Sequence, residues 1–176
     1  MTAAPDALPV SIALLTEADE AGLLALELEN REFFARTVGD RGDDYFAAFP
    51  ARHARLVAEN RDGTSMLFVV RDHEGRVVGR VNIGDIHDGS GDIGYRIAEA
   101  ASGRGVARTA VRLALEAAAE RGVTRITAAT TTDNAGSQRV LAANGFEPLP
   151  NGEPSLLELG ASGRSLPAVH FVRTLG

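Results

Sequence analysis

The stretch Ser102-Gly103-Arg104-Gly105-Val106-Ala107-Arg108 joins a strand-like run, 92–98, to the clearest predicted helix, 106–121. That helix is predicted from one apolar stripe at helical spacing, namely Ala107, Ala110, Val111, Ala114, Leu115 and Ala118. The first N–H groups of a helix lack intrahelical partners, and the helix dipole adds positive character there. The stretch therefore predicts an anion site suited to a pyrophosphate, which the glycines allow to approach the backbone closely.

Two common nucleotide-binding motifs do not fit this stretch. A Walker phosphate loop needs a lysine, whereas all 18 cationic residues of the chain are arginines. A dinucleotide-binding fingerprint needs a third glycine where Arg108 stands, and an acid at the next predicted strand, 126–130, which has none. A glycine-rich connection with arginines facing solvent stays open as the alternative to a phosphate site.

The pattern on either side of this stretch predicts an α/β (α+β) fold with a mixed, mostly antiparallel sheet of about seven strands and helices on both faces. The predicted strands are 10–15, 66–71, 76–85, 92–98, 126–130, a run that begins at Gly145-Phe146, and 168–175. Helices are expected over 16–30, from Asp43 or Asp44 to Asn60 with a break at Pro50, and over 106–121 and 137–143. The segment 31–44 is ambiguous, and 150–167 is typical of loop.

Length and composition indicate a globular protein and argue against several other classes. A chain of 176 residues, 44% hydrophobic and 24% charged, indicates one globular domain over 1–176. The absence of cysteine excludes disulfides, thiolate metal ligands and a cysteine nucleophile. The net charge of −6 disfavours a nucleic-acid partner, and no apolar run is long enough for a membrane span. With no visible signal peptide, we expect a cytoplasmic protein.

A second motif, Asn134-Ala135-Gly136-Ser137-Gln138-Arg139-Val140-Leu141, leads to Asn144-Gly145-Phe146. Together with the turn Arg104–Ala107 and the strand Ile93-Gly94-Tyr95-Arg96-Ile97, it resembles the GCN5-related N-acetyltransferase (GNAT) superfamily. Within that family the chain is similar to the RimJ/RimL-like branch of ribosomal-protein acetyltransferases. The resemblance extends over 67–149, in the expected order and spacing.

The resemblance implies acetyl-CoA as the cosubstrate, and since the sequence shows no metal-ligand constellation, we expect no metal. The implied cofactor-binding residues are Ile97, Ala98, Gly103, Arg104, Gly105, Val106, Ala107, Arg108, Asn134 and Ser137. Arg139 is a further candidate, for the 3′-phosphate. Ser102 departs from the family pattern, because an arginine or glutamine is usual at that position.

The resemblance also implies the catalytic residues Asn134 and Ser137. Many family members carry a tyrosine that protonates the CoA thiolate, and Leu141 stands in its place here. A serine at the position of Ser137 is the expected substitute donor in the RimJ/RimL-like branch. Helix capping is the alternative role for both Asn134 and Ser137.

The amine acceptor is the least defined part of the prediction. Phe33, Asp85 and Glu153 are the candidate acceptor-binding residues, with Glu32, Asp92, His87 and Phe34 as further possibilities. For each of them an ordinary surface or core role is the alternative. The four histidines show no metal-ligand spacing.

Taken together, the sequence predicts an N-acetyltransferase that moves an acetyl group directly to a protein or peptide α-amine. The alternative acceptor is a small amine such as an antibiotic, a polyamine or an amino acid. A non-catalytic acyl-CoA-binding module is the alternative from another class. We expect a monomer or a homodimer.

Overall fold

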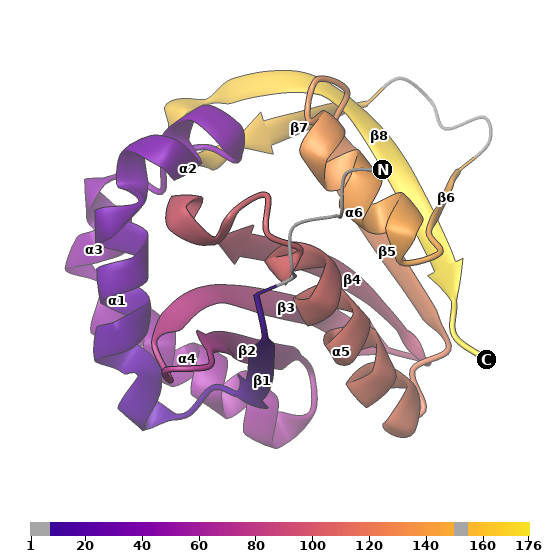
Figure 1. Cartoon of the computed structure of the whole chain (residues 1–176), viewed down its shortest axis with the longest axis horizontal. Coiled ribbons are helices and arrows are strands. Elements are labelled where there is room, and N and C mark those ends of the chain that lie inside the picture. Colours follow the sequence, from indigo (N-terminus) through magenta and orange to yellow (C-terminus); the bar gives the residue numbers. More distant parts are fainter. Residues whose placement is uncertain (1–7, 150–154) are drawn as a thin grey trace.

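The structure is a computed structural model, and it describes residues 8–149 and 155–176. Within these residues the chain forms an eight-stranded sheet with the order β1-β2-β3-β4-β5-β8-β6, and β7 pairs with β8 (Figure 1). The strands are β1 Val10–Leu14, β2 Met66–Asp72, β3 Val77–His87, β4 Ser90–Ile97, β5 Arg125–Thr131, β6 Glu147–Pro148, β7 Leu156–Leu159 and β8 Arg164–Thr174. All described pairings are antiparallel except β4 with β5.

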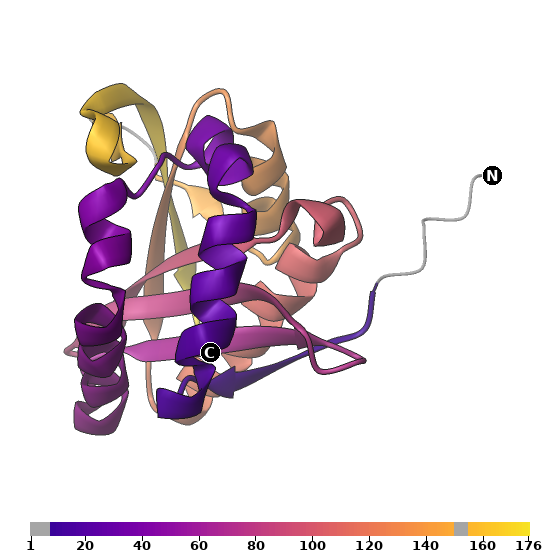
Figure 2. The same ribbon diagram turned by 90° about the vertical axis from the view of Figure 1, so that its left-hand side faces the viewer.

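Helices cover both faces of the sheet, as predicted. They are α1 Glu20–Glu29, α2 Arg31–Thr37, α3 Asp43–Ala47, α4 Phe49–Asp62, α5 Val106–Glu120 and α6 Ala135–Ala143. Figure 2 looks onto α1–α4, which lie in front of the strands, while α5 and α6 lie behind them. In the described part of the chain, no helix has the length and apolar character needed to cross a bilayer.

The strand β2, which lies between β1 and β3, separates two hydrophobic cores on the two faces of the sheet. Its residues Met66–Val70 are buried on both faces, as a continuous apolar run predicts. Phe68 and Val70 pack into the core beneath α5, whereas Leu67 and Val69 pack into a smaller core with α1 and α4. The alternation of side chains along a strand produces this division.

The structure resolves one ambiguous segment, confirms the expected break at Pro50 and differs from the expectation at one predicted loop. The ambiguous stretch 31–44 forms α2 and the start of α3. Pro50 lies in the first turn of α4, where it lacks only an N–H that the helix does not use, so it restarts a helix. The expected loop 150–167 contains β7 and the beginning of β8, because each of them finds a hydrogen-bonding partner in the other.

A close backbone approach fastens the turn after β7 to the loop after α2. Gly160 has φ +63°, and a Cβ there would lie 1.9 Å from the carbonyl oxygen of Asp40. The neighbouring Ala161 N–H donates a hydrogen bond of 2.7 Å to that oxygen. This contact holds β7 and α2 on the same side of the molecule, where both line the cavity described next.

Candidate active site

The parallel strands β4 and β5 pair over only three residues each, Ser90–Asp92 with Arg125–Thr127. Beyond this segment β4 continues to Ile97 and β5 to Thr131, and a cavity of about 730 Å³ opens between them. Backbone N–H and C=O groups on the facing edges are thereby released from strand pairing and become available to a ligand.

The N-terminus of α5 forms one wall of this cavity. Gly105 precedes the helix with φ +76°, and Gly103 has φ +73°. No side chain of the described residues caps α5, and its first turn contains no acid. Val106, Ala107 and Arg108 all line the cavity, so the free N–H groups of the first turn are placed to bind an anion.

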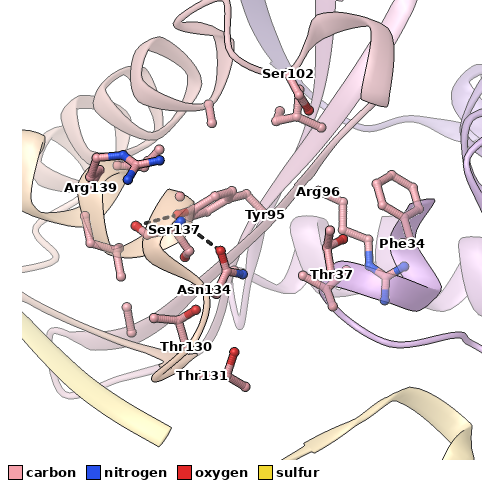
Figure 3. Close-up of a pocket in the computed structure, with 18 of the residues that line it drawn as sticks. Phe34, Thr37, Tyr95, Arg96, Ser102, Thr130, Thr131, Asn134, Ser137 and Arg139 are labelled. Carbon is pink, nitrogen blue, oxygen red and sulfur yellow. Dashed lines mark hydrogen bonds between the residues drawn. The ribbon is translucent and has the colours of Figure 1, made fainter.

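The hydroxyl groups of Tyr95 and Ser137 face each other on the side of the sheet that α5 and α6 cover (Figure 3). The Tyr95 hydroxyl lies 2.9 Å from Ser137 Oγ, a contact in which either hydroxyl can donate, and 3.3 Å from the Ser137 carbonyl oxygen, to which the phenol can donate. Burial raises the pKa of the Tyr95 phenol, which keeps it protonated at neutral pH. Tyr95 belongs to the strand motif 93–97, but the sequence does not show its role, because a contact across 42 residues has no local signal.

Asn134 is the N-cap of α6. Its Oδ1 accepts the Ser137 N–H at 3.0 Å, so the capping alternative holds for Asn134. The cap occupies the oxygen and leaves the Nδ2 amide of Asn134 to donate to a ligand in the cavity that it lines. Ser137 is the third residue of α6, and its Oγ faces Tyr95, not the helix terminus (Figure 3).

The opposite side of the cavity is formed by α2 and β7. Phe33, Phe34, Thr37 and Val38 line it from α2 and the residue after it, and Leu157, Glu158 and Leu159 line it from β7. Arg96 of β4 contributes its guanidinium to the same side (Figure 3). Glu158 is the one acidic residue among the described lining residues, and the sequence does not point to it because 150–167 is expected to be loop.

Most of the predicted cofactor residues gather at the cavity. Those that line it are Ile97, Gly103, Gly105, Val106, Ala107, Arg108, Asn134 and Ser137, together with Arg139. Ala98 and Arg104 instead line a second cavity. The Ala98 N–H donates to the Val78 carbonyl oxygen at 2.8 Å, and the Arg104 carbonyl accepts the Leu8 N–H at 3.0 Å, so these backbone groups are used within the fold.

Of the predicted acceptor residues that the structure describes, only two line the cavity. Phe33 and Phe34 line the cavity, whereas Asp85, Asp92, Glu32 and His87 do not. Partial burial and the neighbouring Asp85 raise the pKa of Asp92, and Thr127 Oγ1 donates a 2.9 Å hydrogen bond to it. Both acids lie at the paired end of β4, before the strands diverge. Glu153 lies outside the described residues.

Comparison with known proteins identifies the family. A model of the acetyltransferase (GNAT) domain matches residues 11–147. A probable N-acetyltransferase of Bacillus subtilis (strain 168), YjcK, is 32% identical over 139 residues, which cover 75% of this chain and 76% of that protein.

Solved structures share the fold. The ribosomal-protein-S5-alanine acetyltransferase of Vibrio fischeri superposes with a TM-score of 0.84 at 24% identity, covering 94% of this chain and 92% of that one. The spermidine N-acetyltransferase of Vibrio cholerae, in complex with CoA and spermine, has a TM-score of 0.76 at 18% identity, with 94% and 95% coverage. RimJ and RimL structures are also similar to this chain.

Proposed function

The chain belongs to the acetyltransferase (GNAT) family and is an N-acetyltransferase, and we propose that it transfers the acetyl group of acetyl-CoA directly to the α-amine of a protein or peptide. The observation that carries the proposal is the cavity between the diverging strands β4 and β5. One side of it presents the N-terminus of α5 and the Tyr95–Ser137 pair, and the other presents Phe33 and Glu158. A cosubstrate and an acceptor can therefore meet from opposite faces of the sheet.

The cofactor side fits the CoA moiety in charge and shape. The pyrophosphate would bind the free N–H groups of Val106, Ala107 and Arg108, with the side chain of Arg108 close to its oxygens. The Asn134 amide is placed to donate to the pantetheine arm. Backbone groups of the diverging part of β4 would hold the acetyl carbonyl.

The reaction is a direct displacement. The neutral amine attacks the thioester carbonyl carbon, the C–S bond breaks, and the departing thiolate takes a proton. Ser137 is the proposed donor, Tyr95 restores its proton through their hydrogen bond, and the phenol regains a proton from solvent. The nitrogen that has attacked releases its extra proton to solvent, which leaves the neutral amide. The chain has no cysteine that could form an acetyl-enzyme intermediate.

Glu158 is the proposed partner of the acceptor amine. An ammonium must lose a proton before it can attack, and a free α-amine has a pKa of about 8. Glu158 is an exposed residue of β7 that lines the cavity on the acceptor side, and we propose that its carboxylate binds the ammonium and accepts that proton.

Three further properties remain predictions of the sequence. We propose that residues 1–176 form a single acetyltransferase domain, that the protein acts in the cytoplasm, and that it is a monomer or a homodimer. None of the steps above requires a metal ion or a nucleic acid.

Acetyl-CoA is expected to raise the melting temperature markedly, because a ligand that binds only the native state stabilises it. NADH and ATP should raise it far less, since neither carries the pantetheine arm that the gap between β4 and β5 would hold. Differential scanning fluorimetry with the three ligands at equal concentration checks this. A thiol-release assay with short peptides then tests for transfer. Equal thermal shifts from all three ligands would contradict the cofactor assignment.

Glu158→Gln is expected to lower kcat/KM for the amine by about tenfold at pH 7, because the amide cannot accept the ammonium proton. Acetyl-CoA affinity should not change. The deficit should shrink above pH 8, where more of the α-amine is already neutral. Glu147→Gln is a matched control, since Glu147 is an exposed glutamate that does not line the cavity. An equal loss in both variants, or a deficit independent of pH, would remove Glu158 from this role.

A further inference from the structure

A buried cluster of charged side chains lies between α1, β3 and β4. Glu27 is at its centre, and its side chain is 1% exposed. The nearest nitrogen of Arg96 lies 3.2 Å from its carboxylate, that of Arg41 3.9 Å and that of Arg80 4.0 Å. Among the described residues no other carboxylate is within ion-pair distance of these three arginines. This arginine cluster thus holds three cations against one anion; Arg80 and Arg96 are buried, whereas the Arg41 side chain is 33% exposed.

The two excess charges persist at neutral pH. Burial, reinforced by the neighbouring Arg41, lowers the pKa of Arg96 to about 10, which still leaves it protonated at pH 7. Burial also lowers the pKa of Arg80. Arg96 lies over the Phe34 ring and Arg41 over the Tyr45 ring, each about 5.0 Å from the centroid. Such contacts stabilise a cation, but the rings bring no compensating charge.

The cluster is only partly satisfied internally: Arg96 donates to Glu27 Oε2 and to the Gly39 carbonyl oxygen, each at 3.2 Å. Glu27 Oε1 and Arg41 Nε are both buried without a hydrogen-bond partner among the described residues. The approaches of Arg41 and Arg80 to Glu27, near 4 Å, are too long for hydrogen bonds. Buried excess charge is costly unless a counter-ion compensates it. Arg80 and Arg96 are therefore two buried cations with one buried anion, so one positive charge has no buried counter-ion among the described residues.

Arg96 connects the cluster to the cavity. It follows Tyr95 on β4, so the two side chains point to opposite faces of the sheet. Tyr95 points to Ser137, on the side of α5 and α6, and Arg96 points to α1 and α2, where its side chain is 9% exposed and lines the cavity near Phe34 (Figure 3). An anion bound by Arg96 would therefore lie on the acceptor side, away from the N-terminus of α5.

We propose that the acceptor carries a carboxylate close to its reactive amine, and that Arg96 binds this carboxylate. The inference rests on the proposed function and names the substrate class of the same site. Glu158, also in the cavity wall, would hold the ammonium while Arg96 holds the carboxylate. Polyamines are disfavoured acceptors, because their second cationic group would meet the excess positive charge of the arginine cluster.

Peptides that differ in one residue test this inference. Three peptides share an N-terminal alanine and differ only in Asp, Asn or Lys at the second position. The kcat/KM for the Asp peptide should exceed that for the isosteric Asn peptide by about tenfold, and the Lys peptide should be the poorest of the three. Free aspartate and spermidine complete the panel. Acetylation of free aspartate at a rate near that of the Asp peptide would assign the carboxylate to a small amino acid.

Thr37→Asp supplies a carboxylate from the protein itself. Thr37 lines the cavity on the side of Arg96, so an acid there should reduce the preference for Asp over Asn to about twofold or less. Thr37→Asn, of nearly equal shape but neutral, should keep the preference. This pair of variants avoids Arg96 itself, whose removal would leave Glu27 buried with weaker partners and threaten the fold.

The possible outcomes separate the two proposals. Equal rates for the Asp and Asn peptides, or a best rate for the Lys peptide or spermidine, overturn the carboxylate inference and leave acetyl transfer standing. A preference for Asp that survives unchanged in Thr37→Asp also overturns it. If acetyl-CoA binds and no amine in the panel is acetylated, the proposed acceptor class and the inference both fall.

Discussion

Gly105→Glu is expected to lower the affinity for acetyl-CoA by about 100-fold while the protein still folds. The substitution places a side chain and a negative charge at the residue before α5, where the pyrophosphate should approach the free N–H groups of the first turn. Isothermal titration with acetyl-CoA measures the loss directly. The melting temperature of the ligand-free variant shows how much of the effect is structural.

A matched control separates the effect of the negative charge on acetyl-CoA affinity from the effect of backbone strain. Gly105 has φ +76°, so any larger residue there is strained by about 1 kcal/mol or more. Gly122, just after the other end of α5, has φ +81° and open space around its α-carbon. Gly122→Glu should therefore lower stability by a similar amount and leave acetyl-CoA affinity unchanged. Wild-type affinity in Gly105→Glu, or an equal loss in Gly122→Glu, would locate the pyrophosphate elsewhere.

The parts of the fold and site that the sequence predicted are those with local causes. The apolar stripe of α5, the glycines before it and the cap residue Asn134 each act within a few residues of their own position. The mostly antiparallel sheet with helices on both faces follows from the alternation of such segments, and the structure confirms it.

The missed parts depend on contacts between distant segments. β7 is a strand because β8 pairs with it, and the weak pattern of 156–159 does not predict a strand by itself. Glu158 was missed for the same reason. Asp85 was a candidate for the acceptor site, but only the register of β3 with β4 shows that it lies at the paired end of β4. The arginine cluster draws its members from α1, the loop after α2, β3 and β4, so no segment alone suggests it.

The proton relay gives the other prediction with a large expected effect. Ser137→Ala should lower kcat by about 10- to 100-fold with little change in acetyl-CoA affinity, because the hydroxyl acts as the thiolate departs. Tyr95→Phe should produce a loss of similar size, since the phenol supplies the proton to Ser137. The double variant should be little worse than either single one, because the two hydroxyls act as one unit.

The free energy of unfolding and the pH dependence of kcat distinguish this proton relay from a purely structural role of the same residues. The side chain that caps α6 is that of Asn134, so Asn134→Ala should lower the free energy of unfolding by about 1 kcal/mol, whereas Ser137→Ala should lower it less. Burial raises the pKa of Tyr95 above its ordinary value near 10, so the donor stays protonated and kcat should not decline between pH 7 and 9. Presteady-state mixing establishes that chemistry limits kcat. If the losses from Ser137→Ala and Tyr95→Phe then multiply in the double variant, the two hydroxyls act independently and the thiolate receives its proton by another route.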